Sequence, residues 1–361
     1  MRTQVSDLAR PISIVVEFSN THASPSLADW IYFMSIASRS RFGCRGWAQP
    51  TVIMALAIAV VVAFMSNLGI AAEEPDEEKY VAQIFIGYAD GTEMRQLADL
   101  PEYQSQGSPN WSQDGKRIAF DAYKPQNGEG IHDGHLIVVD SDGTNARDLG
   151  RGLMPSLSPN GKRVVYSIYS PGGEGGVCIV DVDDPKKKIQ IDASGWGADW
   201  SPDGVHVAYA RGNNLILYNV DDGTSEEIFD GNSSPLRRIY WNFSWSTDGR
   251  QLAFKASTKY SESILAVVDA KKGGHGFKVL YEGEIYECVD WTPDGKQIIV
   301  AMRDPNRKDR IGLFTLNVEG PPEPRLFPNE LIDRKVSDPS FSPDGEQLAV
   351  QAFKKAPAAK E

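Results

Sequence analysis

Two stretches of the chain carry a tryptophan outside the repeat pattern, and the second adds two arginines and a tyrosine, a mixture suited to binding more than to covalent chemistry. The stretches are ASGWGAD (193–199) and SSPLRRIYWNF (233–243). Their candidate residues are Trp196, Arg237, Arg238, Tyr240 and Trp241. Arginine, tyrosine and tryptophan are enriched among the residues that carry most of the energy of protein interfaces. The alternative is that each loop folds its rings back over its own strands, and the residues leave both interpretations open.

Other connecting segments carry single arginines, lysines and tyrosines. Three of them complete the predicted binding set, namely Arg211, Tyr286 and Arg303. Further side chains of this kind are Tyr123, Tyr169, Lys255, Tyr260 and Arg307. Taken singly, each is an ordinary solvated surface group. They would form a site only by converging around one opening.

Residues that could bind a metal are few and poorly spaced. IHDGH (131–135) places His132 and His135 on either side of Asp133, but this spacing matches no standard zinc signature. VDSDGTN (139–145) begins like a calcium loop, yet it lacks the distal glutamate and favours a hairpin turn. We therefore expect no metal site and no cofactor.

Catalytic patterns are also missing from the sequence. The chain has no Gly-x-Ser-x-Gly nucleophile elbow. GGEGG (172–176) follows no strand-to-helix pattern, so it is a flexible connection and not a phosphate loop. Glu282, Glu284 and Glu287 could supply carboxylates, but their spacing favours a solvated acidic loop. We expect no catalytic residues.

A turn of the Ser-Pro-Asp-Gly type recurs six times and organises the chain. Its glycines are Gly115, Gly161, Gly204, Gly249, Gly295 and Gly345. Successive glycines lie 46, 43, 45, 46 and 50 residues apart. Proline presets the second turn position, Asp or Asn bonds the local backbone, and glycine accepts the positive φ that closes the turn. A period in the forties matches four strands per repeat, as in one blade of a β-propeller.

A large apolar residue stands four positions before each of these glycines. The six residues are Trp111, Leu157, Trp200, Trp245, Trp291 and Phe341. A residue that recurs once per repeat at the same place favours packing between neighbouring blades. We therefore interpret these tryptophans as core residues and not as a ligand cage.

A second type of hairpin follows each of the first five Ser-Pro-Asp-Gly hairpins, but the two types are permuted by half a repeat at the ends of the repeat region. The second hairpins occupy 135–150, 176–192, 214–229, 263–281 and 311–327. A sixth hairpin of this second type, at 81–99, has no Ser-Pro-Asp-Gly hairpin before it. The last Ser-Pro-Asp-Gly hairpin, in turn, has no second-type hairpin after it. We expect strands near 81–98 and 337–353 to share one blade and close the ring. The predicted fold is an all-β, six-bladed propeller of four-stranded blades over residues 81–353.

These repeats resemble the WD40-like, Pro-Asp-Gly repeats of the TolB family and of bacterial TolB-like propellers. The resemblance implies a propeller that docks a partner in the cell envelope at one face. The sequence departs from the family because its repeats begin directly after the predicted leader and linker, whereas in TolB an α/β domain precedes the propeller. The resemblance therefore implies the fold and the mode of binding, but not the particular partner.

The N-terminal segment has the features of an export signal. Three arginines precede the apolar run at 52–65, and small residues follow it before Glu73. This order predicts a secretory signal peptide at 34–72, with an uncleaved N-terminal anchor as the alternative. Residues 1–33 fit a misassigned start site or a disordered extension. We expect a linker at 73–80 and a disordered tail at 354–361.

Charge and cysteine content narrow the partners. The chain carries a formal net charge of −12, and the part after residue 72 carries −14. A body this acidic repels phosphate backbones, so we expect no nucleic-acid partner. Cys178 and Cys288 fall in blades that are not neighbours, which favours two buried thiols. We expect contact with a membrane only through an uncleaved leader, and a monomer.

Two functions fit these observations. The first is an exported, periplasmic or extracellular, non-catalytic propeller that binds a protein or a cell-envelope component through the loops between blades. The alternative is a channel-centred carbohydrate-active lyase or hydrolase, which could depend on a metal. Tight-turn residues are nearly the same in every repeat, whereas the connecting loops vary, so we expect the site among the connecting loops.

Overall fold

The computed structural model describes residues 80–124, 133–169, 175–230, 234–240, 243–271, 276–307, 310–331 and 335–355, except for the side chain of residue 287. The expectations for the leader and for the end of the tail concern residues 1–79 and 356–361, which lie outside these ranges. Within the described ranges, no helix is long and apolar enough to cross a membrane.

Strands make up the regular structure of the described residues. In chain order they are β1 (Tyr80–Tyr88), β2 (Arg95–Gln96), β3 (Ser105–Trp111), β4 (Arg117–Tyr123), β5 (Gly134–Asp140), β6 (Arg147–Arg151), β7 (Leu153–Leu157), β8 (Arg163–Ile168), β9 (Gly176–Asp181), β10 (Lys188–Asp192), β11 (Trp196–Trp200), β12 (His206–Arg211), β13 (Asn214–Asn219), β14 (Ser225–Glu227), β15 (Leu236–Ile239), β16 (Ser244–Trp245), β17 (Gln251–Thr258), β18 (Ile264–Asp269), β19 (Phe277–Glu282), β20 (Ile285–Trp291), β21 (Gln297–Arg303), β22 (Ile311–Asn317), β23 (Arg325–Leu326), β24 (Val336–Phe341) and β25 (Gln347–Lys355).

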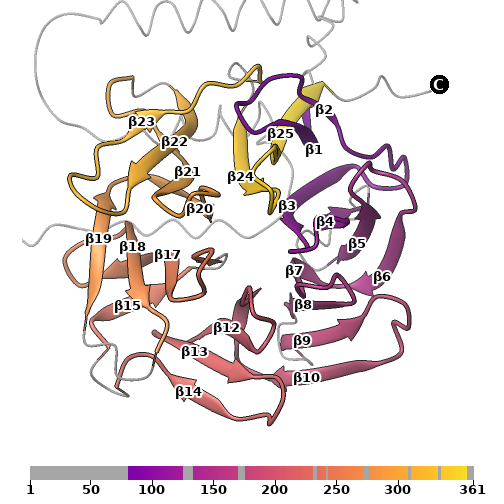
Figure 1. The fold of residues 1–361 in the computed structure, drawn as a ribbon, viewed down its shortest axis with the longest axis horizontal. Helices are drawn as coiled ribbons and strands as arrows, with labels where there is room; N and C mark the ends of the chain where they lie inside the picture. Colours follow the sequence, from indigo (N-terminus) through magenta and orange to yellow (C-terminus); the bar gives the residue numbers. More distant parts are fainter. Residues whose placement is uncertain are drawn as a thin grey trace, which may run out of the picture. The chain divides into compact units, whose positions relative to one another are not determined.

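The strands form six antiparallel sheets arranged in a ring, and each sheet is one blade (Figure 1). We name the sheets blade 1 (β3–β6), blade 2 (β7–β10), blade 3 (β11–β14), blade 4 (β15–β19), blade 5 (β20–β23) and the closing blade (β24, β25, β1 and β2). In blade 4 the inner strand is split, because β15 and β16 both pair with β17. The predicted six-bladed propeller is confirmed.

The recurrent turn forms the same hydrogen bonds in every blade. In blade 3 the Ser201 hydroxyl donates to Asp203 Oδ1 at 2.5 Å, and the Gly204 N–H donates to the Ser201 carbonyl at 2.9 Å. Gly204 adopts a φ of +74°, which is open to glycine at little cost. The equivalent hydroxyl-to-Asp or hydroxyl-to-Asn bond occurs in the other five turns. The turn chemistry inferred from the sequence is therefore the chemistry observed.

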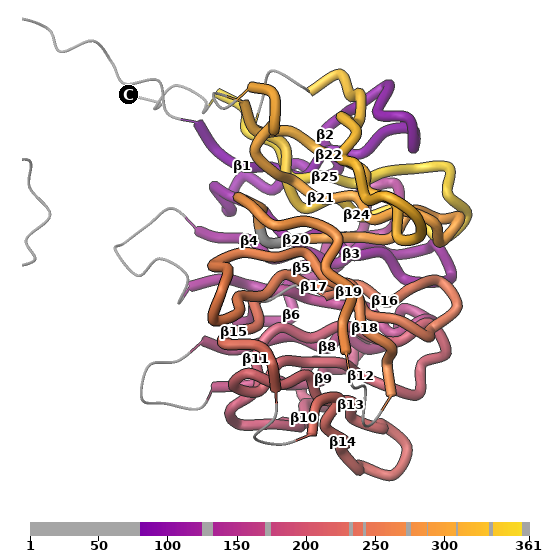
Figure 2. Tube along the Cα trace, turned by 90° about the vertical axis from the view of Figure 1, so that its left-hand side faces the viewer, coloured from indigo at the N-terminus to yellow at the C-terminus, as the bar shows by residue number. Residues whose placement is uncertain are grey.

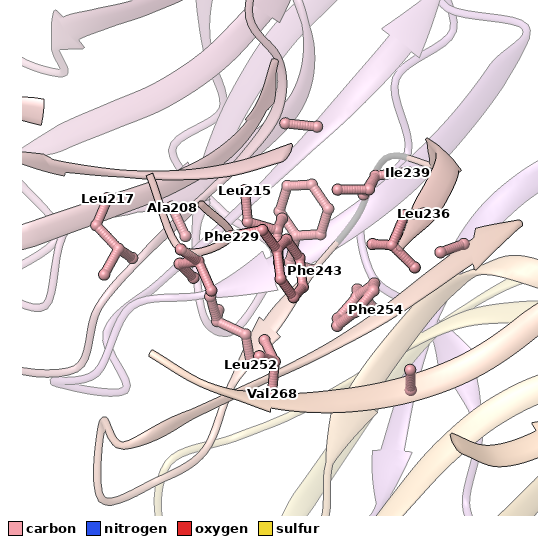
Figure 3. Close-up of a cluster of buried hydrophobic side chains, with 14 of the residues drawn as sticks. Ala208, Leu215, Leu217, Phe229, Leu236, Ile239, Phe243, Leu252, Phe254 and Val268 are labelled. Carbon is pink, nitrogen blue, oxygen red and sulfur yellow. The ribbon is translucent and has the colours of Figure 1, made fainter. Parts of the chain in front are cut away.

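The hydrophobic core consists of six clusters, and each cluster lies between two neighbouring blades. Figure 3 shows the cluster between blades 3 and 4, where Leu215 and Phe229 of blade 3 lie beside Phe243 of blade 4. Each apolar residue before a turn belongs to a cluster with the preceding blade. Two tryptophans also bond across the interface, since Trp245 Nε1 donates to the Asp199 carbonyl at 3.1 Å and Trp291 Nε1 to the Ser244 carbonyl at 3.0 Å. The predicted inter-blade role of these residues is confirmed.

The ring closes through the first and last strands of the propeller. β1 pairs with β25 over nine residues, from Tyr80 opposite Lys355 to Tyr88 opposite Gln347. Figure 1 shows these strands side by side, with the indigo start of the chain against its yellow end. The predicted closing blade is confirmed, and β25 continues to Lys355, into the segment expected to be a tail.

Connections between strands separate onto two rims of the ring. The turn rim carries the six tight turns and the turns between the two outer strands of each blade, and these gather on the right of Figure 2. The loop rim carries the connections between second and third strands and those between blades. Because Tyr80 and Lys355 are paired, both ends of the propeller lie on the loop rim.

The inter-blade packing makes a test of the core. Trp245 is 7% exposed, so Trp245→Ala should lower the free energy of unfolding by about 3–5 kcal/mol through lost contacts and an unfilled cavity. Chemical denaturation followed by tryptophan fluorescence and circular dichroism measures this. Ile189→Ala is the control, because Ile189 is 54% exposed on an outer strand and should change stability by no more than about 0.5 kcal/mol. Equal effects of the two substitutions would contradict inter-blade packing of Trp245.

Candidate functional site

Each inner strand is irregular close to the loop rim. Ser108, Met154, Gly197 and Asp338 stand seven residues before their turn glycines, and all four have positive φ angles of 50–57°. The pairing of the four strands also shifts register there, as in a β-bulge. A bulge bends the strand and turns backbone groups away from the ladder. The irregularity therefore recurs around the channel and shapes its mouth.

Side chains of neighbouring strands bond to the backbone N–H groups that the bulges release. The Met154 N–H donates to Asp121 Oδ2 at 2.9 Å, and the Gly197 N–H donates to Ser167 Oγ at 2.9 Å. The Ser108 N–H donates to Asp338 Oδ2 at 3.2 Å. Backbone donors left unpaired inside a protein are costly, so these side chains help to stabilise the bulges. Asp121 and Asp338 consequently have a structural role whatever else they do.

A cavity of about 940 Å³ opens at the mouth of the channel on the loop rim. All six inner strands or the segments beside them line it, through Ser108, Met154, Trp196, Arg238, Tyr286 and Asp338. The second strand of blade 1 adds Asp121 and Tyr123, and Tyr169 follows the second strand of blade 2. A concave site of this size, with aromatic walls and a few polar groups, is typical of ligand pockets.

The two carboxyl groups in the cavity lie close together around Gly107. A Cβ atom on Gly107 would lie 3.0 Å from Asp121 Oδ1 and 3.8 Å from Asp338 Oδ2. Burial raises the pKa of Asp121 to about 7, and the nearby charge of Asp338 raises it further. Burial also raises the pKa of Asp338, although hydrogen bonds from Cys288 and the Ser108 N–H oppose the shift. Two carboxyls that share a poorly hydrated site resist ionising together.

Aromatic rings form much of the cavity wall. Tyr169 meets Trp196 edge to face, with ring centroids 5.6 Å apart, and 41% of Tyr169 is exposed. Tyr123 has a pKa well above its usual value, because it is buried and faces Asp121 and Asp338. Tyr286 donates its hydroxyl to Glu284 Oε1 at 3.3 Å. The wall is therefore mostly apolar above an acidic floor.

A cationic sector lies on the blade 4 side of the mouth. The Arg238 guanidinium lies 4.9 Å from the ring centroid of Tyr240, and Lys255 Nζ lies 4.5 Å from the same ring. Contacts of this kind are favourable because the ring face is electron-rich. Arg238 also lines the cavity and is exposed. The mouth thus has acidic residues from blade 1 and the closing blade, and basic residues from blade 4.

The eight residues predicted to bind a partner are dispersed. Trp196, Arg238 and Tyr286 line the cavity, and Tyr240 packs against Arg238. Trp241 lies outside the described residues. The remaining three are ion-paired, Arg211 with Asp192 and Glu227, Arg237 with Glu262, and Arg303 with Glu284.

Arg237 and Arg211 do not contribute to the mouth cavity itself. Arg237 lines a separate groove of about 680 Å³ with Tyr260, Phe277 and Val279. Arg211 lies between Ala210 and Gly212, which line the mouth cavity, but its guanidinium is committed to its two acidic partners. The structure therefore brings together half of the predicted set at the mouth.

The two carboxyl groups at the floor of the cavity, Asp121 and Asp338, were not among the residues predicted from the sequence. Asp121 occurs in RIAFDAY (117–123), where an aspartate interrupts an otherwise apolar strand. Asp338 precedes Pro339 and looks like an ordinary turn residue. The signal available for Asp121 was its position in the middle of a strand, where a charge is costly unless it is exposed or bonded. No such signal existed for Asp338.

The histidine fragment does not form a metal site in the part of the chain that is described. His135 Nδ1 lies 2.9 Å from Asp148 Oδ2, and the Tyr103 hydroxyl donates to the same oxygen at 2.7 Å. His132 lies outside the described residues. Within the described ranges, no group of three or more His, Cys, Asp or Glu side chains is placed to hold a metal ion. The expectation of no cofactor stays a prediction.

A belt of polar side chains crosses the inner strands one step nearer the turn rim. Its members stand five residues before the turn glycines and are Asn110, Ser156, Asp199, Ser244, Asp290 and Ser340. Ser156 Oγ donates to Asp199 Oδ1 at 2.6 Å, and Ser244 Oγ donates to Asp290 Oδ1 at 2.7 Å.

Backbone N–H groups of alternate blades complete the belt. The Leu157 N–H donates to Asn110 at 2.8 Å, the Trp245 N–H to Asp199 at 3.2 Å and the Phe341 N–H to Asp290 at 2.8 Å. The belt surrounds a cavity of only about 60 Å³, so the space inside the ring narrows sharply below the mouth. It links adjacent blades by hydrogen bonds where the apolar clusters end.

Comparisons with known proteins show the same propeller fold. The sequence matches the family model described as the TolB beta propeller domain over residues 122–348. The fold is similar to TolB from Acinetobacter baumannii, with a TM-score of 0.50 and 15% identity, covering 83% of this chain and 69% of that one. It is also similar to a protein described as putative TolB from Agrobacterium tumefaciens, with a TM-score of 0.57 and 17% identity, covering 77% of this chain and all of that one. A search of curated proteins finds no match.

The belt predicts how stability depends on pH. Burial raises the pKa of Asp199 to about 7 and that of Asp290 to about 6, above the ordinary value of 3.8. The folded protein therefore holds these protons more tightly than the unfolded chain does. The free energy of unfolding should fall as the pH rises from 5 to 8, because the folded protein then loses these protons. Asp199→Asn with Asp290→Asn should flatten this slope, by up to about 1.4 kcal/mol per pH unit for each titrating group.

Denaturation at several pH values measures the slope. Asp203→Asn is the control, because hydrogen bonds from Ser201 and the Val205 N–H outweigh partial burial and lower the pKa of Asp203. The Asp203 carboxylate stabilises the fold until the pH falls through its lowered folded-state pKa. The Asp203→Asn substitution should therefore leave the slope between pH 5 and pH 8 unchanged. A double variant with the slope of the unmodified protein would show that the belt carboxyls do not titrate in this range.

Proposed function

Because the chain belongs to the TolB β-propeller family, we propose that it is an exported, non-catalytic binding module that engages a protein or another cell-envelope component through its loop rim. The observation that carries the proposal is the mouth cavity, which all six inner strands or the segments beside them line. Trp196, Tyr286 and Arg238 supply there the residue types that dominate binding energy at interfaces.

Export is supported by the order of features in the N-terminal segment. Arginines, an apolar run and small residues precede Glu73, as in a secretory signal peptide.

The ion pairs of Arg211, Arg237 and Arg303 are partly exposed, so these arginines suit the polar rim of an interface better than its centre. The strongly acidic body makes a nucleic-acid partner unfavourable.

The carboxyl pair supports a second candidate, a channel-centred carbohydrate-active enzyme. Asp121 lies in the cavity with a pKa raised to about 7, and acids with raised pKa values are typical of proton donors in sugar cleavage. Incubation of the purified protein with a panel of envelope and plant polysaccharides tests this reading. Cleavage that disappears in Asp121→Asn would replace the binding proposal with the enzyme.

Binding through the mouth makes a direct prediction. The full chain, purified from the cells that express it, should capture a specific envelope component, which mass spectrometry identifies and surface plasmon resonance measures. Tyr169→Ala and Trp196→Ala should each weaken that binding at least about tenfold, because they remove exposed aromatic area at the mouth.

The control is an aromatic residue on the other rim. Tyr88 is 52% exposed at the end of β1, beside the turn closed by the Tyr88 N–H and the Thr92 carbonyl. Tyr88→Ala should leave the affinity unchanged. If nothing binds, or if the three variants bind alike, the loop-rim site is wrong.

A further inference from the structure

The floor of the mouth cavity carries two carboxyl groups that lack a cationic partner among the described residues. Asp121 is 3% exposed and lines the cavity, and Asp338 lines it from the closing blade. Neither forms an ion pair with lysine, arginine or histidine in the part of the chain that is described. Buried charges in proteins are normally paired or bound to a metal.

Hydrogen bonds satisfy these carboxylates only in part. Asp121 accepts from the Met154 N–H and from the Ser108 hydroxyl, and Asp338 accepts from the Ser108 N–H, from Cys288 and from the Ser337 side chain. A carboxylate offers about four lone-pair sites, so the pair can accept further donors. The Gln351 amide also lies beside Gly107, but its Nε2 already donates to the Gln106 carbonyl at 2.8 Å.

Space for a ligand group exists at this floor. A Cβ on Gly107 would lie only 2.9 Å from Gln351 Nε2 and 3.0 Å from Asp121 Oδ1, so glycine allows these side chains to approach the backbone at the floor. The floor also belongs to the cavity of about 940 Å³, which opens to the loop rim. A group that enters from the rim can therefore approach both carboxylates.

The walls suit an organic cation better than a metal ion. Tyr123, Tyr169, Trp196 and Tyr286 line the cavity, with Arg238 on its blade 4 side, and aromatic faces attract ammonium and guanidinium groups. Among the residues that the structure describes, no group of three or more His, Cys, Asp or Glu side chains is placed to hold a metal ion. Ammonium and guanidinium groups supply several donors, which match the unused lone pairs.

We propose that the mouth cavity binds a primary ammonium or guanidinium group, with Asp121 and Asp338 as its counter-charges and the tyrosines and Trp196 as its walls. The inference rests on the proposed binding function and names the chemistry of the ligand. The group is the end of a lysine or arginine side chain of a protein partner, or a free amine of the same chemistry. Its binding replaces the missing positive charge and completes the hydrogen bonds of both carboxylates.

The test uses simple probes and the full chain, without any partner. Ac-Gly-Gly-Arg-Gly-Gly-amide represents a peptide-borne cation, and n-butylguanidinium represents a free one. The matched neutral probe is the same peptide with citrulline in place of arginine, which keeps the shape and removes the charge. Isothermal calorimetry and ligand-observed NMR measure binding at pH 8, where Asp121, with a pKa of about 7, is largely ionised.

The arginine peptide should bind at least about tenfold more tightly than the citrulline peptide, since a hydrogen bond from a charged donor to a carboxylate is roughly twice as strong as one between neutral groups. Asp121→Asn and Asp338→Asn should remove most of this difference. Asp248→Asn is the control, because it removes one exposed carboxylate from the turn rim and should leave the difference intact. Preference for the peptide over n-butylguanidinium would assign the cation to a protein partner, and the reverse would assign it to a free small molecule that carries the same group.

Equal binding of the arginine and citrulline peptides to the unmodified protein would overturn the inference, whether or not the variants fold. Undiminished preference for arginine in both folded Asp→Asn variants would overturn it as well. Neither result bears on capture of an envelope component, so failure of this inference and failure of the proposed function remain distinguishable.

Discussion

The pairing of β1 with β25 is the constraint on which the rest of the molecule depends. A four-stranded blade cannot bury its own two faces, so each apolar cluster needs a neighbouring blade on either side. The ring can supply that neighbour to every blade only if the two ends of the propeller meet, and nine residue pairs join them. Closure also builds the site, because it brings Asp338 within hydrogen-bonding distance of the Ser108 N–H, 230 residues earlier in the chain.

Stability and function share the inner strands. The bulges at the loop rim release backbone N–H groups, and the carboxyl groups that bond them form the floor of the mouth cavity. Nearer the turn rim, the belt around Asp199 and Asp290 joins blades where the apolar clusters end. One ring of strands therefore supports two polar layers, of which the upper opens to solvent and the lower encloses a small space.

Much of the fold could be predicted from the sequence, because its signals are local and repeated. The Ser-Pro-Asp-Gly turns specify their own hydrogen bonds, and Trp245 occupies the place between blades that its position in the repeat indicated. The candidate site was less predictable. Trp196 and Arg238 line the mouth, but Arg237, next in sequence to Arg238, lies beside a different groove, because successive residues of a strand point to opposite faces. Asp121 escaped notice because an isolated aspartate in a strand gives no sign of the carboxyl that faces it.

The sequence by itself determined the number of blades, the permuted closing blade and the identity of the packing residues, since all three follow from the count and order of the repeated hairpins along the chain. Only the tertiary structure decided which side chains meet at the channel mouth. Those residues come from different blades, and their spacing depends on how the bulges bend the inner strands and on where the ring closes. A repeat specifies its own hairpins through short-range interactions, but a shared cavity results from the relative placement of blades that no single repeat encodes.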